Sequence, residues 1–259
     1  MGNFVSYSNI NKRGGIGNQF FYYAFVKSYA LKYECQLKTP KDWIFRKLFK
    51  LPSMDPIIED GDNYPIMEEN YIPDGKVNID LNGCFQEKRH TSFYKKEDCL
   101  KYFEFFDEYK NLFPYDPKDR YIAVHVRRGD YLENLWWACT ISYESYLEIL
   151  EEANKENLEI RWVYEKDIPD WPEKRFKSDL ENPDDKIMSW LPDFFTLINS
   201  EILIRANSTF SYWAGMFHKG KSIYSPRVNG ITGDNQFVKF ENNNKCRVQS
   251  TCFEWDDFI

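Results

Sequence analysis

The sequence predicts an α/β protein of two lobes, the second of which is built on a parallel sheet. In the second half of the chain, apolar strand-like runs alternate with helical patterns, which favours parallel strands joined by right-handed crossovers. One apolar run near the N-terminus and two in the second half are followed by glycine, arginine or small polar residues, where open α/β sheets build ligand sites. With 259 residues, 42% of them hydrophobic, the chain can bury one large core or two small ones, and we expect two.

The expected division is an N-terminal lobe of residues 1–115, a C-terminal lobe of residues 116–228 and a tail of residues 229–259 that packs back or is mobile. Pro114–Pro117 is the expected linker. The first lobe is expected to contain a strand at 3–7, a buried helix at 20–33, an extended loop at 52–76 and a helix at 94–113. In the second lobe, strands at 121–126, 159–164, 201–205 and 222–225 alternate with helices at 143–154, 187–199 and 208–217.

The segment H-V-R-R-G-D-Y, His125–Tyr131, follows the apolar run Tyr121–Val124. Guanidinium groups are always charged and match phosphate oxygens with two parallel hydrogen bonds, so Arg127 and Arg128 predict a diphosphate site. The alternative is that both are solvated loop charges in surface ion pairs of little energetic value.

Two further segments carry the same kind of signal. Near the start, R-G-G-I-G-N-Q, Arg13–Gln19, lies between a strand and a helix, where glycines admit a ligand and the first helical amides bind anions. Its spacing differs from the dinucleotide and P-loop motifs, which disfavours dinucleotide binding and ATP hydrolysis. In the last quarter, A-N-S-T-F-S-Y-W-A-G, Ala206–Gly215, follows an apolar strand. Its polar residues predict a helix cap, with or without a second phosphate contact.

Together and in this order, these motifs resemble the α-1,2-fucosyltransferases of glycosyltransferase family 11, within the H-x-R-R fucosyltransferase superfamily. The resemblance extends to Ile160–Asp167, to Trp171 and to Ser222–Pro226. Glu165 and Lys166 replace the usual Ser-Asp, and Tyr212 replaces a tryptophan. These departures leave the recognition of the base and the acceptor open.

The resemblance implies the GT-B architecture of two Rossmann-type lobes whose parallel sheets face a central cleft. It places the acceptor on the N-terminal side and the donor nucleotide on the C-terminal side. It also implies inverting transfer of L-fucose from GDP-β-L-fucose to a hydroxyl of a glycan or glycoconjugate, with an expected α-1,2 linkage. Two alternatives stay open: a transferase for another GDP-deoxyhexose or a UDP-sugar, and a nucleotide-sugar binding protein without catalysis.

Within that reading, Arg127 and Arg128 stabilise charge that develops on the β-phosphate. Asp130 and Glu133 are candidate general bases, although Asp130 is also suited to hold one of the arginines in place. The expected donor-binding residues are Gly15, Gly17, Asn18, His125, Asp167, Asn207, Ser208, Thr209 and Ser211.

We expect neither a metal nor a cofactor, because the arginines can neutralise the leaving diphosphate. Asp60-Gly61-Asp62 has a metal-binding spacing but lies in a polar loop rather than after a strand. The three histidines lack a metal-ligand spacing. The six cysteines lack a C-x-x-C pair and are expected to be reduced thiols.

Composition limits the partners. A net charge of −7 argues against a general nucleic-acid binder, because such binding rests on phosphate neutralisation. The sequence shows no signal peptide and no run of about 18 apolar residues, so we expect a cytoplasmic protein without a membrane span. Peripheral contact with a membrane stays open.

Overall fold

The computed structural model describes residues 2–62, 64–68, 75–129, 131, 141–165, 171–172 and 189–224. The chain divides into two compact units, of which unit 1 ends at Leu112 and unit 2 begins at Phe113. The division falls just before the Pro114–Pro117 segment. The expected tail, residues 229–259, lies outside the described residues.

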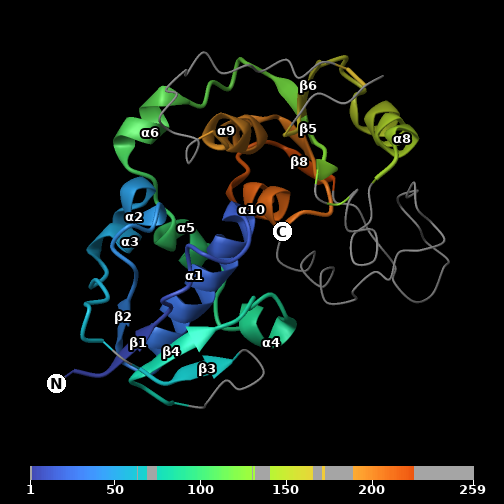
Figure 1. Cartoon of the computed structure of the whole chain (residues 1–259). Coiled ribbons are helices and arrows are strands. Elements are labelled where there is room, and N and C mark those ends of the chain that lie inside the picture. Colours follow the sequence, from blue (N-terminus) through green and yellow to red (C-terminus); the bar gives the residue numbers. More distant parts are fainter. Residues whose placement is uncertain are drawn as a thin grey trace, which may run out of the picture. The chain divides into compact units, whose positions relative to one another are not determined.

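Unit 1 contains a four-stranded parallel sheet in the order β2-β1-β4-β3 (Figure 1). Its strands are short: β1 (Phe4–Ser6), β2 (Gln36–Lys38), β3 (Ile66–Glu68) and β4 (Ile79–Asn82). β3 lies within the segment 52–76, so the expectation of a loop throughout that segment was wrong.

Helix α1 (Ile16–Lys32) is the core of unit 1. Apolar side chains cover nearly its whole circumference, which predicts a buried helix rather than an amphipathic one. Phe20 and Phe25 are both fully buried. The ring of Phe20 lies 4.7 Å from Phe45 and 4.8 Å from Phe103, measured between centroids. The prediction of a buried helix here is therefore confirmed.

The helix expected at 94–113 is instead two short helices, α5 (Lys96–Tyr102) and α6 (Asp107–Leu112). The chain between them turns extended: the Lys50 amide donates to the Glu104 carbonyl at 2.9 Å, and the Phe106 amide to the Leu48 carbonyl at 3.0 Å. This pairing buries Phe105 against Phe49, with ring centroids 4.4 Å apart. Three other short helices complete the unit: α2 (Phe45–Leu48), α3 (Lys50–Met54) and α4 (Lys88–Thr91).

Unit 2 contains a second parallel sheet, in the order β6-β5-β7-β8. Strands β5 (Tyr121–His125), β6 (Glu159–Val163), β7 (Ile202–Ile204) and β8 (Ser222–Tyr224) alternate with helices α8 (Tyr143–Ala153), α9 (Leu191–Asn199) and α10 (Thr209–Phe217). Helix α8 covers one face of this sheet, and α9 and α10 lie on the other (Figure 1). The predicted alternation and the α/β fold with two parallel sheets are confirmed.

The strand register of unit 2 determines which side chains lie on each face of its sheet. Ile122 pairs with Ile202, and Val124 with Ile204. These residues pack together with Tyr146 of α8 in one apolar cluster. Because neighbouring residues of a strand point to opposite faces, Ala123 and His125 face the other way. All five residues of β5 are buried, as expected of a strand covered on both faces.

In each sheet, the order in which the chain adds strands reverses at one point. In unit 2 the chain passes from β5 to β6 on one side and then to β7 on the other, so the order reverses between β5 and β7. In unit 1 the same reversal lies between β1 and β4. Ligands of open α/β sheets bind outside the carboxyl ends of the strands at such switch points.

Candidate functional site

The switch point of unit 2 brings together two motifs that the sequence analysis selected separately. The H-V-R-R segment follows β5, and the A-N-S-T segment follows β7. Tyr131 ties the two loops, because its hydroxyl donates to the Asn207 carbonyl at 3.0 Å. Its own amide donates to the Arg128 carbonyl at 2.7 Å. The segments lie 76 residues apart in sequence at this contact but form one edge of the sheet.

The two arginines have different neighbours. The guanidinium carbon of Arg127 lies 5.4 Å from the ring centroid of Tyr131, and its Nη1 lies 3.7 Å from Glu165 Oε2. The guanidinium carbon of Arg128 lies 5.4 Å from the ring centroid of Trp171. Both arginines are half-buried. Stacking on a ring orients a guanidinium group while its edge keeps donors for a ligand.

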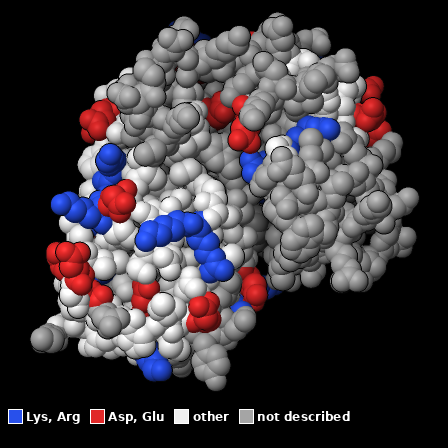
Figure 2. Space-filling view, in the orientation of Figure 1, with Lys and Arg blue, Asp and Glu red and all other residues white. Residues whose placement is uncertain are grey.

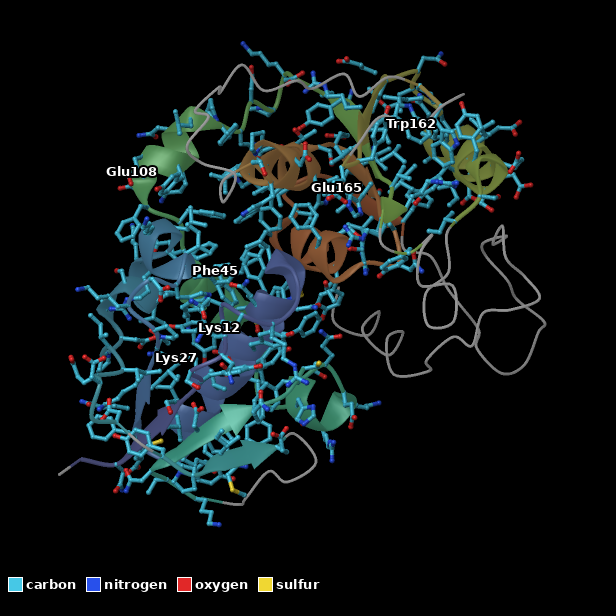
Figure 3. The ribbon with its side chains drawn as sticks, viewed as in Figure 1. Lys12, Lys27, Phe45, Glu108, Trp162 and Glu165 are labelled. Atoms are coloured by element: carbon cyan, nitrogen blue, oxygen red, sulfur yellow. The ribbon has the colours of Figure 1, made fainter. Side chains whose placement is uncertain are left out.

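Trp171 belongs to the α8 side of the sheet. Its ring lies 4.7 Å from Tyr143 and 6.0 Å from Trp162, and Figure 3 shows Trp162 between β6 and α8. Arg128 therefore rests on the α8 side, whereas Arg127 lies beside Glu165. The two guanidinium groups therefore contact different side chains and do not act as one paired hydrogen-bond donor.

His125 and Arg205 end neighbouring strands and are both buried, with 6% and 4% of their surface exposed. The His125 ring lies 5.6 Å from Phe210, and its carbonyl accepts from the Tyr146 hydroxyl at 2.9 Å. Burial raises the pKa of Tyr146, so this hydroxyl stays protonated and can donate. Arg205 lies 5.2 Å from the ring centroid of Tyr212.

Sequence reasoning passed over three residues of this edge: Tyr131, Glu165 as a site residue, and Arg205. The signal for Arg205 was present, because a charged residue directly ends the apolar run Ile202–Ile204. No local signal marks the bond of Tyr131, since its partner loop becomes adjacent only through strand pairing.

The hydroxyls after β7 shape their own loop. Ser208 is the N-cap of α10, and its Oγ accepts from the Phe210 amide at 3.2 Å. Ser211 is fully buried and donates to the Ala206 carbonyl at 2.9 Å. These two residues therefore fix the start of α10, whereas Asn207 and Thr209 are half-buried at the loop surface. The positive end of the α10 dipole lies at the switch point.

In unit 1, the glycine-rich loop leads into α1, whose N-cap is Gly15. Gly14 has a φ of +65°, and a Cβ there would collide with Asn18 Nδ2. Around Gly15, by contrast, a Cβ would meet nothing within 4 Å. Asn18 Oδ1 accepts from Gln86 Nε2 at 3.0 Å, and Gly17 is buried within α1.

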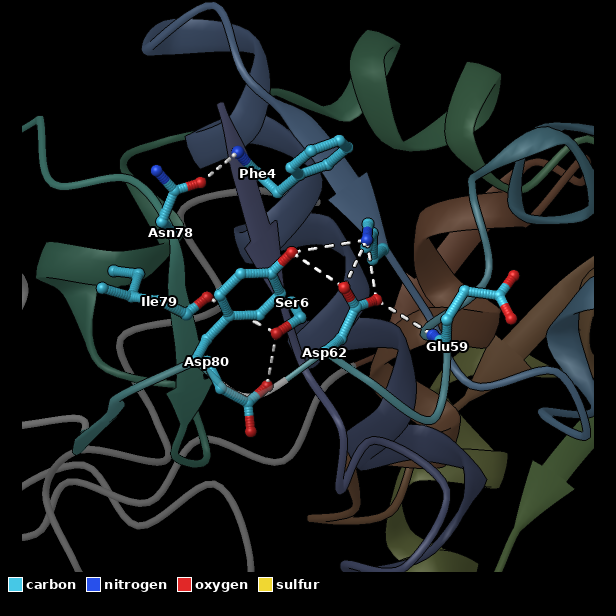
Figure 4. Close-up of polar contacts among 9 residues, drawn as sticks. Phe4, Ser6, Glu59, Asp62, Asn78, Ile79 and Asp80 are labelled. Carbon is cyan, nitrogen blue, oxygen red and sulfur yellow. Dashed lines mark hydrogen bonds and ion pairs between the residues drawn. The ribbon is translucent and has the colours of Figure 1, made fainter. Parts of the chain in front are cut away.

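The Asp60-Gly61-Asp62 segment uses one of its carboxylates in an ion pair (Figure 4). Lys38 Nζ donates to both oxygens of Asp62, at 2.8 and 2.7 Å, and the Glu59 amide donates at 2.9 Å. The hydrogen bond from Lys38 lowers the pKa of Asp62. Among the described residues, no group of three or more His, Cys, Asp or Glu is placed to hold a metal.

Asp130, Glu133 and Asp167 lie outside the described residues, so their roles stay predictions. Cys35 and Cys99 have free thiols. On the face shown in Figure 2, acidic and basic side chains of the described residues are interspersed. No helix in the described part of the chain is long and apolar enough to cross a membrane.

Comparison with solved structures finds the fucosyltransferase NodZ from Bradyrhizobium, which is 14% identical with a TM-score of 0.56. A structure of NodZ α-1,6-fucosyltransferase soaked with GDP-fucose is 15% identical with a TM-score of 0.54. Each match covers 84% of this chain and 93% of the other. At this identity the likeness establishes the shared fold. None of the curated proteins matches the sequence significantly.

The sequence model described as glycosyl transferase family 11 matches residues 77–249. The match spans most of the chain and includes both loops at the switch point of unit 2. This chain therefore belongs to glycosyl transferase family 11.

Proposed function

We propose that this glycosyltransferase moves L-fucose from GDP-β-L-fucose to a hydroxyl of a glycan acceptor, with inversion and an expected α-1,2 linkage. The observation that carries the proposal is the convergence of the arginine loop and the A-N-S-T loop, joined by the bond from Tyr131 to Asn207. Family membership supports glycosyl transfer. The GDP-fucose named for the NodZ structure supports the choice of donor.

Transfer breaks the bond between fucose C1 and the β-phosphate oxygen, through a transition state with oxocarbenium character. Negative charge grows on the leaving diphosphate as the acceptor oxygen approaches C1 and gives up its proton. Groups that bind this growing charge more strongly than the ground state accelerate the step. In our proposal Arg128 is the main such group, and Arg127 assists it. Asp130 and Glu133 remain the candidates for accepting the proton.

The remaining donor contacts divide by position. Asn207, Thr209 and the start of α10 suit the diphosphate, because a helix N-terminus favours anions. His125, which is buried at the end of β5, and Asp167 stay predictions for contacts to the nucleoside. Gly15, Gly17 and Asn18 stay predictions for a further donor contact in unit 1.

Arg128→Ala tests the central role. We expect turnover of GDP-fucose to fall by about 10²–10³-fold, as for removal of one transition-state donor in other enzymes, with the melting temperature nearly unchanged. Arg128→Lys should also fail, because a point charge cannot reproduce the planar fork.

The matched control is Arg120→Ala, at the amino end of the same sheet. Arg120 forms exposed ion pairs with Glu156 and Glu201, so its loss should leave turnover intact. Near wild-type turnover of Arg128→Ala at saturating donor would refute the assigned role.

We further propose that the reaction needs no metal ion, because Arg127 and Arg128 supply positive charge beside the diphosphate. Turnover of GDP-fucose should survive EDTA. Complete loss of turnover in EDTA, restored by Mn²⁺ or Mg²⁺, would contradict this account.

Hydrolysis measured across GDP-fucose, other GDP-sugars and UDP-sugars tests the donor. Preference for a different GDP-deoxyhexose or for a UDP-sugar would replace fucose while keeping the same site. Binding of a nucleotide sugar with no turnover on any glycan would instead favour the non-catalytic alternative.

A further inference from the structure

Glu165 occupies a distinctive place beside the arginine loop. It follows the end of β6, and the pairing with β5 continues to this point because the Val126 amide donates to the Val163 carbonyl at 2.9 Å. Figure 3 shows Glu165 on the α9 side of unit 2, whereas Trp162 lies toward α8. The carboxylate is 65% exposed.

Gly129 makes room for this carboxylate. A Cβ at Gly129 would lie 2.8 Å from Glu165 Oε2, so any larger residue there would push the end of this flexible, exposed side chain aside. The absence of a side chain at Gly129 therefore lets Glu165 lie directly against the loop that carries both arginines. The sequence supplies a carboxylate and the space for it at the same edge of the sheet.

An ion pair with Arg127 does not by itself account for this placement. The separation of 3.7 Å from Arg127 Nη1 is long for a charged hydrogen bond, and both side chains are partly exposed. Such pairs contribute little to stability. A carboxylate beside the proposed diphosphate also repels it, unless the carboxylate binds a different, hydrogen-bond-donating part of the same ligand.

The part of a nucleoside diphosphate that donates hydrogen bonds next to its phosphates is the ribose diol. In Rossmann-type sheets the phosphates lie at the end of the first strand. The ribose hydroxyls reach an acidic residue after the second strand, on the side away from the switch point. β5 and β6 are the first and second strands of this unit, and Glu165 follows β6.

We propose that the Glu165 carboxylate accepts hydrogen bonds from the ribose hydroxyls of the donor nucleotide and makes the site selective for a ribonucleotide. The inference rests on the proposed function, because it requires the diphosphate at the arginine loop. It assigns a recognition role to a residue that departs from the family pattern.

The test compares the binding of GDP, 2′-deoxy-GDP and 3′-deoxy-GDP by calorimetry. A hydrogen bond to a charged group is worth about 1.5–3 kcal/mol. The wild-type protein should therefore bind GDP roughly 10-fold or more tightly than at least one deoxy analogue. In Glu165→Ala this ratio should fall close to one, and Glu165→Gln should retain an intermediate ratio. Glu151→Ala removes the same charge from the exposed surface of α8 and should leave the ratio unchanged.

The ratio separates recognition from electrostatics, because loss of a negative charge strengthens the binding of all three nucleotides alike. Equal improvement for all three in Glu165→Ala, with the wild-type ratio retained, would overturn the ribose assignment. A wild-type protein that binds GDP but does not distinguish either deoxy analogue would overturn it as well. Failure of the wild-type protein to bind GDP at all would refute the proposed function together with the inference.

Discussion

Two neighbouring glycines in the loop before α1 have different physical reasons for being glycine. Gly14 adopts a left-handed conformation, and its α-carbon lies against the Asn18 side chain. Gly15 has extended backbone angles, φ −79° and ψ 177°, that any residue can adopt, with open space where a Cβ would be. The fold explains Gly14, whereas Gly15 is the glycine that a closely approaching ligand would explain.

This contrast gives a paired prediction. Gly14→Ala should destabilise the protein by about 1–2 kcal/mol from the left-handed backbone, with an added cost for displacing Asn18. Gly15→Ala should lower the melting temperature less than Gly14→Ala, because alanine is only a poorer N-cap than glycine, but should reduce turnover of GDP-fucose, because the new methyl group occupies ligand space. Thermal melting and steady-state kinetics of both variants check this. Unchanged turnover in Gly15→Ala would remove Gly15 from the donor-binding set.

At the same scale, the sequence located most of the residues around the switch point but not their roles. Ser211 was expected to bind the donor, and its hydroxyl also donates to the Ala206 carbonyl within the loop, so its donor-binding role stays a prediction. A one-dimensional pattern cannot separate a hydroxyl that binds phosphate from one that shapes a turn, since both roles favour the same residue types. Tyr131 and Arg205 owe their positions to strand pairing, which no local window reports.

At the scale of elements, the site consists of two loops that are joined by the side chain of Tyr131. Tyr131 stacks on Arg127 through its ring and bonds Asn207 through its hydroxyl, so it positions groups from both loops. It is a positioning residue, because its hydroxyl contacts the protein rather than the reacting atoms.

Tyr131→Phe keeps the ring and removes this bond. A neutral hydrogen bond is worth about 0.5–1.5 kcal/mol, so we expect the KM for GDP-fucose to rise roughly 2- to 10-fold. The matched control is Tyr121→Phe, which loses a bond of 2.9 Å to the Thr196 carbonyl away from the loops. That variant should lose stability without a change in KM. Equal kinetic effects in both variants would argue against a positioning role for Tyr131.

Elements of unit 2 followed their sequence patterns closely. In unit 1, β1 and the buried helix α1 did so too, but the strands β3 and β4 and the segment 94–113 were not predicted as they are. In unit 2, β5 and β7 are continuous apolar runs buried on both faces. In unit 1, β4 includes Asp80, whose burial is made possible by a hydrogen bond from Ser6 at 2.8 Å (Figure 4) and another from Ser8 at 2.6 Å. Those partners lie more than 70 residues away in sequence. The local sequence around Asp80 therefore does not indicate that this strand is buried. The edge strand β3 has three residues and an exposed Ile66, too little for a periodic signal.

At the scale of the whole molecule, the chain consists of two units with separate apolar cores, and each sheet has its own switch point. Proteins with more than one unit often unfold in more than one step. A ligand held by unit 2 raises the stability of every native species that contains the folded unit, in proportion to its affinity.

Nucleotide binding should therefore raise the melting transition that includes unit 2, with GDP or GDP-fucose giving a larger shift than UDP or ADP at equal concentration. The stabilisation is about 2.7 kcal/mol when the free nucleotide is a hundredfold above its dissociation constant. Selectivity arises because a pocket built to pair with guanine leaves buried polar groups unsatisfied by another base, at about 1–3 kcal/mol each. Differential scanning fluorimetry with the four nucleotides measures the order. Arg128→Ala should reduce the GDP shift, and Arg120→Ala should not. A UDP shift equal to or larger than the GDP shift would reject GDP-fucose as the donor and favour a UDP-sugar transferase on this fold.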